Sequence, residues 1–406
     1  MGACVGIAAT AVGSCAGMCL GMCCGKAVTA GTVTNEEANK RMYLFLQVVT
    51  VIMSLFCRAY GQNWVKWVPT GIHDCHSDQH MTLCFQENLI DRVQFALSVL
   101  FVVLVMSCAC GAGMAGKMTQ GWFVGKFLWV PVVALIALFI PNGFFDGWSS
   151  ACTLAGFVFT IAELILFVEF GICLNQELIE KGEKESQREF GSTGKKWYIV
   201  NLVISVLLFL VFLVGCIAML VVFDDTVSRW CVGVLFVVCL TLGLLGLWDK
   251  FNRGMLPGAV FLAFMTYVIW QALLFSPLHA GKNYNSAVMW IGLLIAAFCL
   301  ASVVANPELM QLSPEDQQAH DMYSAEQGGQ DGEEEAPVVD LKKLVLFLLV
   351  HLAAAMYANL LLSGTPTSKH SADWFGFWVS MSAAFVCAAL YGWTFIAPLI
   401  LKGREF

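Results

Sequence analysis

The chain has 406 residues, of which 59% are apolar and 13% are charged, roughly half the charged fraction of an average soluble domain. Its mean hydropathy is +0.74. One water-exposed surface could not hide this much apolar material, so the composition excludes a disordered chain and argues strongly against a soluble enzyme. The net charge of −7 arises from residues 307–340, which hold ten acidic residues and no Lys or Arg. No basic tract indicates a nucleic-acid partner.

Residues 1–37 form an N-terminal segment rich in Cys, Gly and Ala. The segment lacks the basic start of a secretory signal. Its cysteines recur in part every four residues, which places them on one face of a helix. Three interpretations stay open: a small-residue helix that packs closely on a neighbour or lies at the membrane interface, palmitoylation beside the inner leaflet, and a metal site, although CxxxC pairs without His are poor zinc signatures. The candidate palmitoylation sites are Cys4, Cys15, Cys19, Cys23 and Cys24.

Long uncharged runs then predict membrane-spanning helices. The hydrocarbon core of a bilayer is about 30 Å thick and needs about 20 apolar residues in a helix, and backbone groups in lipid must be hydrogen-bonded internally. We therefore expect an all-α polytopic membrane protein with about ten transmembrane helices, eight within residues 38–306 and two within residues 341–406. The spans are expected at 42–57, 93–116, 127–145, 147–180, 197–223, 230–248, 254–281, 283–307, 344–368 and 374–401.

The distribution of positive charge predicts the orientation of these helices. With a cytoplasmic N-terminus, sixteen of the 22 Lys and Arg residues fall on the cytoplasmic side, as the positive-inside rule requires. Both termini are then cytoplasmic, residues 307–340 form an acidic cytoplasmic loop, and a short cytoplasmic tail follows the last helix. The composition of the acidic loop cannot bury enough apolar surface to fold by itself.

The longest outer loop is expected at residues 58–91. It contains Cys75 and Cys84 together with three histidines at positions 73, 76 and 80. A Cys75–Cys84 disulfide is the economical interpretation in an oxidising compartment. A zinc or copper site is a second interpretation, although the spacing matches no strong template, and the absence of both is a third.

Polar side chains within the spans are costly in lipid, so they usually face protein or water. The candidates for a polar groove are Lys126, Glu163, Glu169, Asn175 and Gln271. The buried acids need partners, and Lys126 or His351 could supply them. The polar residues either join helices or form a path for an ion, a proton or a lipid head group.

The sequence carries no recognisable catalytic motif. It contains no GxSxG, HExxH, P-loop or Rossmann glycine run. We therefore expect no enzymatic activity, no cofactor and no resident metal.

Three stretches resemble the Serinc family, also called serine incorporators. The C-terminal LYGWTFIAPLILKGREF is similar to the family pattern LYxWTxxAPxxxxxRxF and places Tyr391 and Pro398. QGWFVGKFLWVPVVALIALFIPNGFF is similar to NGFWFFKFLxxxGxxxxxFYIPDGxF and places Lys126. LFVEFGICLNQEL is similar to LLIDFAHxWNxxW and places Glu169 and Asn175. In order and spacing the similarity covers nearly the whole chain, which looks like a divergent member.

The resemblance implies two four-helix bundles separated by two crossing helices, at about 148–180 and 285–306. It also implies action on membrane lipids, as help for serine entry into phosphatidylserine and sphingolipids or as non-ATP-driven scrambling of phospholipids between leaflets. The alternatives are a secondary transporter of serine or another small polar solute, and a scaffold for lipid-synthesis enzymes docked on the acidic loop. The expected partners are membrane phospholipids, then lipid-synthesis enzymes and further copies of the chain. The expected location is the plasma membrane or the endomembranes of the endoplasmic reticulum and Golgi.

Overall fold

The structure is a computed structural model, and it describes residues 35–61, 81–110, 114–115, 118–119, 123–188, 195–246, 254–279, 285–305, 341–363 and 374–400. The N-terminal cysteines, the expected acidic loop at 307–340, and Cys75 with the three loop histidines lie outside these ranges. Cys84 is on a described helix, but its side chain is not described. The predicted palmitoylation and disulfide therefore stay predictions.

The described chain is all helical. Its long helices are α2 (Asn35–Tyr60), α3 (Met81–Ala109), α5 (Phe123–Ala137), α6 (Asn142–Arg188), α7 (Lys195–Val222), α8 (Thr226–Leu245), α9 (Met255–Leu274), α10 (Asn285–Ala305), α12 (Leu341–Ser363) and α13 (Trp374–Ile400). Within the described ranges nine helices are long and apolar enough to cross a membrane, and α5 is a shorter apolar helix of 15 residues. The expectation of an all-α, multi-pass integral membrane protein is confirmed.

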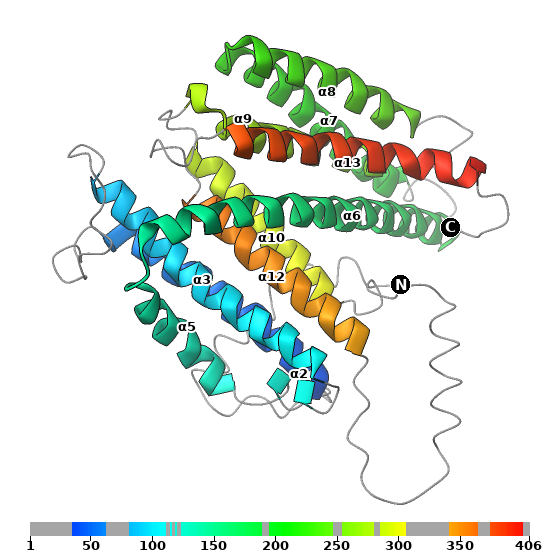
Figure 1. Cartoon of the computed structure of the whole chain (residues 1–406). Helices are drawn as coiled ribbons and strands as arrows, with labels where there is room; N and C mark the ends of the chain where they lie inside the picture. The colour runs from blue at the N-terminus through cyan, green and yellow to red at the C-terminus, as the bar shows by residue number, and fades with distance from the viewer. Residues whose placement is uncertain are drawn as a thin grey trace, which may run out of the picture.

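The helices pack in two clusters on either side of α6 (Figure 1). The first cluster contains α2, α3, α5 and α12, around a core that includes Tyr43, Phe101 and Phe347. The second contains α7, α8, α9 and α13, around a core that includes Phe212 and Met381. α10 contributes residues to both cores. The fourth and eighth helices, α6 and α10, thus lie between two four-helix clusters, as the family resemblance implies.

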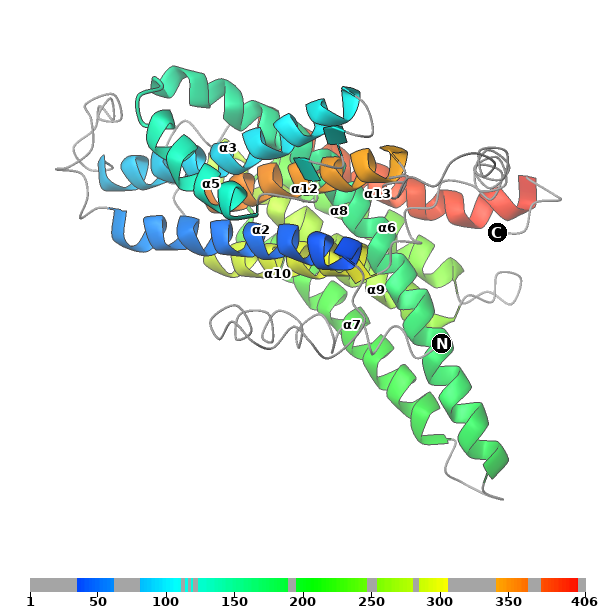
Figure 2. The ribbon, with the colours of Figure 1, turned by 90° about the horizontal axis from the view of Figure 1, so that it is seen from below.

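α6 is much longer than the hydrocarbon thickness of a bilayer. Its candidate span, Asn142–Glu185, has 44 residues, or about 66 Å at the rise of an α-helix. It runs obliquely to α2, α3 and α12 and continues beyond them alongside α7 (Figure 2). One helix therefore contacts both clusters and carries polar residues at several depths.

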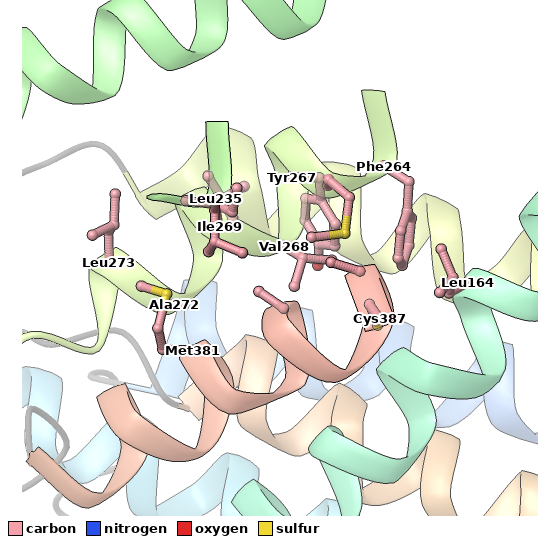
Figure 3. Close-up of a cluster of buried hydrophobic side chains, with 14 of the residues drawn as sticks. Leu164, Leu235, Phe264, Tyr267, Val268, Ile269, Ala272, Leu273, Met381 and Cys387 are labelled. Carbon is pink, nitrogen blue, oxygen red and sulfur yellow. The ribbon is translucent and has the colours of Figure 1, made fainter. Parts of the chain in front are cut away.

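α9 is enclosed by its neighbours. Of its most apolar stretch 89% is buried, against 22% for α7. Val268, Ile269 and Ala272 of α9 face Met381 and Cys387 of α13 in the core (Figure 3). Lipid is as apolar as these side chains, so close van der Waals packing rather than escape from water holds α9 in place. The exposed apolar residues of α7 and α8 are those expected to face lipid.

The prediction of one continuous span at 127–145 is wrong. α5 ends at Ala137, the backbone N–H groups of residues 138–140 each bond to the carbonyl three residues earlier, and α6 begins at Asn142. Pro141 explains the break, because it disfavours helical backbone at the residue before it and has no N–H to donate. Arg92 completes the corner by donating to the carbonyl oxygens of Ala137 and Ile140, each at 3.0 Å.

The outer loop is also shorter than the expected 58–91. α2 runs to Tyr60 and α3 begins at Met81, so both ends of the predicted loop are helical. These helix ends can hold charged residues because the charged side chains have hydrogen-bond partners. Arg58 donates to the carbonyl oxygen of Leu362 at 2.6 Å. Counting uncharged residues ended each predicted span at the first charged residue, but the helices continue past these residues.

Candidate functional site

Lys126 lies inside the first cluster, away from the buried acids. Its ammonium donates to the phenol oxygen of Tyr43 and to the carbonyl oxygen of Thr119, each at 2.8 Å. It also lies 4.6 Å from the ring centroid of Phe123, and the residue is only 6% exposed. These contacts join α5 to α2. The hypothesis that Lys126 neutralises an acid of α6 is therefore wrong.

His351 is not a partner of the acids either. Its Nδ1 lies 3.0 Å from the carbonyl oxygen of Phe347, and its ring centroid is 5.6 Å from that of Phe101. The residue is fully buried among aromatic rings of the first cluster. Lys126 and His351, the two partners that the sequence suggested, therefore pair with neither Glu163 nor Glu169.

Glu163 is a fully buried carboxyl group on α6. Neither of its oxygens has a hydrogen-bond partner among the described residues. The groups that interact with it electrostatically include the phenols of Tyr267 on α9 and Tyr357 on α12. Glu163 thus lies where α6 meets helices of both clusters.

Gln271 belongs to the same junction. The hydroxyl oxygens of Tyr267 and Tyr357 are 2.6 Å apart, and the Tyr357 hydroxyl donates to Oε1 of Gln271 at 3.2 Å. Sequence reasoning missed both tyrosines. The available signal was that a tyrosine buried in a span must find a partner for its hydroxyl.

Asn175 lies at a second junction, toward the end of α6 that is predicted to be cytoplasmic. Asn201 of α7 donates its side-chain amide to Oδ1 of Asn175 at 2.8 Å. Gly254, which precedes α9, has a φ of 83° and leaves room for this amide, because a Cβ there would lie 2.6 Å from Nδ2 of Asn175. The Asn175 amide thus joins α6 and α7 beside the start of α9.

Glu169 differs from the other candidates because it is partly exposed. It has no hydrogen bond or ion pair within the described part of the chain. Ile165 and Val158 lie on the same face of α6 and are 57% and 59% exposed, which is the exposure expected of side chains that face lipid. Glu169 is therefore a carboxyl group at the edge of an apolar, lipid-facing stripe.

The five predicted residues do not line one groove. Gln271 is bonded to Tyr357 at the central junction, where Glu163 lies without a hydrogen bond of its own among the described residues. Asn175 lies at the junction with α7, and Glu169 lies at the lipid-facing surface. Lys126 lies apart from all of them. Within the described ranges no group of three His, Cys, Asp or Glu residues could hold a metal ion.

The family follows from comparison with known proteins. A family model described as Serine incorporator (Serinc) matches residues 12–404 of this chain. The chain belongs to the Serinc family. Serine incorporator 3 of Mus musculus is 21% identical over 447 aligned positions, which cover 92% of this chain and 93% of the mouse protein. Serine incorporator 2 of Bos taurus is 23% identical and covers 90% of each chain.

A probable serine incorporator of Dictyostelium discoideum is 24% identical to this Serinc chain over 258 residues. That match covers 60% of this chain and 58% of the Dictyostelium protein. The low identities agree with a divergent member, whose individual polar residues must be judged from their own surroundings.

This Serinc chain has another polar group that sequence reasoning missed. Asp91 of α3 interacts with the side chains of Asn359 and Ser363 of α12, and Asn359 also donates to Sγ of Cys152 at 3.5 Å. Asp91 and Arg92 come just before the uncharged run 93–116, so counting that run left Asp91 outside the predicted helix. The group joins α3, α6 and α12 at the ends predicted to face outward.

Proposed function

We propose that this Serinc protein lets phospholipid head groups cross the bilayer without ATP, with serine-containing and other amine-bearing phospholipids as its substrates. The names of its relatives concern serine incorporation, and phosphatidylserine is a lipid into which serine is built. The protein itself carries out no catalysis in this proposal. It lowers the free energy of a polar head group in hydrocarbon.

The observation that carries the proposal is the position of Glu169. A carboxyl group at a lipid-facing surface is costly and usually marks a functional path. Because no described residue bonds to it, it stays available to a ligand. A lipid ammonium group is the complementary partner, and the tails of that lipid remain in the surrounding hydrocarbon.

Asn175 and Asn201 lie beyond Glu169, toward the end of α6 that is predicted to be cytoplasmic, but on another side of the helix. Asn175 is six residues from Glu169, which is about 9 Å along a helix and about 120° around it. Asn175 is also buried and bonded to Asn201, so Glu169 is the polar group that this face of α6 offers to a head group. A carboxyl group on the route replaces part of the lost hydration, which is the main cost of moving a polar group into hydrocarbon.

The test is a scrambling assay with the full-length protein in liposomes that contain fluorescent phospholipids, using a membrane-impermeant quencher. Glu169→Gln keeps the shape and removes the charge, and we expect transfer of phosphatidylserine to slow about tenfold, the effect of losing about 1.4 kcal/mol in the transition state. Ile165→Ala on the same face of α6 is the matched control and should scramble normally. Phosphatidylglycerol, which has no amine, should be less affected by Glu169→Gln.

Wild-type vesicles that scramble no faster than protein-free vesicles would contradict the proposal. Proton-driven uptake of radiolabelled serine in that case would support the transporter alternative. For the location, we propose a plasma-membrane or endomembrane protein with both termini in the cytoplasm.

A further inference from the structure

Glu163 is a buried acid at a point where five helices meet. It belongs to α6, and its electrostatic neighbours are Tyr267 on α9, Tyr357 on α12, Cys299 on α10 and Cys387 on α13. Its side chain is 0% exposed. Both its oxygens lack a hydrogen bond within the described residues. A carboxyl group in such a place is either neutral or held by a cation.

No side-chain cation of the described residues faces Glu163. Lys126 is bonded to Tyr43, Arg58 to Leu362, and Arg92 to the corner before α6. His351 shares α12 with Tyr357 but contacts rings of the first cluster. The remaining titratable neighbours are the phenols and thiols already named, which are neutral hydrogen-bonding groups. An ionised Glu163 would therefore be an isolated charge in the protein interior.

The tyrosine hydroxyls leave no proton for Glu163. Tyr357 donates its proton to Oε1 of Gln271, so Tyr267 is the donor in the 2.6 Å contact between the two hydroxyls. Tyr267 has then used its only proton as well. Neither phenol donates to Glu163, whose two oxygens have no hydrogen-bond partner among the described residues, so a carboxylate there would lack a donor.

Gly292 of α10 fixes the position of the Tyr267 hydroxyl. A Cβ at Gly292 would overlap the hydroxyl oxygen of Tyr267 and would also lie 2.9 Å from Leu361. The absence of a side chain at Gly292 thus lets the hydroxyl lie against α10 and close to Tyr357. The hydrogen-bonded chain comes from α9 and α12, Gly292 of α10 leaves room for it, and Glu163 lies beside it on α6.

We infer that Glu163 is a proton-binding site at the junction of the two clusters. In the packed state the bound proton forms the O–H bond of a neutral carboxylic acid, which lies beside the hydrogen-bonded chain from Tyr267 through Tyr357 to Gln271. Release of the proton to water breaks that O–H bond and leaves a bare carboxylate between α6, α9 and α12. The charge then favours hydration and loosening of this junction, so that proton occupancy controls how tightly the clusters are joined. This property is separate from head-group binding at Glu169.

Infrared difference spectroscopy of the full chain in lipid nanodiscs tests the site. A neutral carboxylic acid has a C=O stretching band that shifts in D₂O, and ionised carboxylates do not contribute to it. At neutral pH we expect one such band in the wild type that is missing in Glu163→Gln and retained in Glu185→Gln, a control at the far end of α6. An unchanged spectrum in Glu163→Gln would overturn the proposal.

A second variant keeps the test informative if Glu163→Gln does not fold. Glu163→Asp keeps a carboxyl group at this position, so the C=O band should remain but change in frequency. A band identical to that of the wild type would overturn the assignment to Glu163. A carboxylate band that responds to replacement of Na⁺ by a bulky organic cation, and is lost in Glu163→Gln, would show a metal cation at Glu163 and overturn the proton site.

Discussion

The ammonium of Lys126 donates to the phenol oxygen of Tyr43, and both groups also donate to the carbonyl oxygen of Thr119. Three polar groups from distant parts of the sequence are thereby satisfied together inside an apolar cluster. Such a network rigidifies a core when every member is bonded. Lys126 is therefore a structural link of the first cluster in this Serinc protein.

Removal of this link should destabilise the first cluster. Lys126→Met deletes two charge-assisted hydrogen bonds and two cation–π contacts, and we expect a loss of about 1.5–3 kcal/mol. Thermal unfolding of the detergent-solubilised protein measures the effect. Lys184→Met removes only an exposed ion pair with Glu180, which should cost less than about 1 kcal/mol. Equal losses for the two variants would contradict the structural role of Lys126.

Gly254 and Asn175 should be coupled energetically. Gly254→Ala places a side chain on left-handed backbone and drives its Cβ into the Asn175 amide, so we expect a loss of about 1–2 kcal/mol from the backbone alone and more from the overlap. In an Asn175→Ala background the overlap disappears, and Gly254→Ala should cost less. A double-mutant cycle measured by thermal unfolding gives the coupling. Strictly additive effects would show that the close approach is unimportant.

Arg92 should hold the corner between α5 and α6. Its guanidinium bonds to the carbonyl oxygens of Asn88, Ala137 and Ile140 and to the side chain of Asn142. Arg92→Gln removes the charged donor of these four hydrogen bonds, and we expect a loss on the order of 3 kcal/mol.

The readout for Arg92→Gln is the yield of monodisperse protein together with its melting temperature. Arg229→Gln, at an exposed position of α8, is the control and should behave like the wild type. A similar small effect for both variants would mean that Pro141 alone maintains the corner.

If the short α5 crosses together with the nine longer helices of the described chain, ten crossings place both termini on one side of the membrane. Epitope tags at the N- and C-termini should be labelled only after intact cells are permeabilised, because the positive-inside rule places these ends in the cytoplasm. A tag inserted between residues 62 and 80 should be labelled without permeabilisation. Labelling of the two terminal tags on opposite sides would show that an odd number of helices crosses the membrane. The short α5 would then not be one of them.

Particular residues show where sequence reasoning succeeded and where it stopped. Uncharged runs located the helices well, since α10 at Asn285–Ala305 and α13 at Trp374–Ile400 nearly coincide with their runs. The same counting placed one helix across Pro141 and ended others at Arg58 and Asp91. An uncharged run shows which residues lipid can surround. It does not show that a proline ends a helix or that a charged residue is bonded to a neighbouring helix.

The candidate polar residues were recognisable individually, because a polar side chain in an apolar run stands out. Their grouping was not recognisable. Tyr267 and Tyr357 are 90 residues apart, and nothing in their spacing indicates that they meet beside Glu163. Lys126 and Glu169 occur on consecutive long helices of the chain, yet they lie in different surroundings.

By itself the sequence determined that this protein is helical, spans the membrane many times and belongs among the serine incorporators. The physical reason is local: in hydrocarbon each span must satisfy its own backbone, so length and apolarity along the chain are sufficient signals. Only the tertiary structure decided which polar groups are bonded, which are buried alone and which face lipid. Those outcomes depend on contacts between helices far apart in sequence, where packing and hydrogen-bond geometry select the partners.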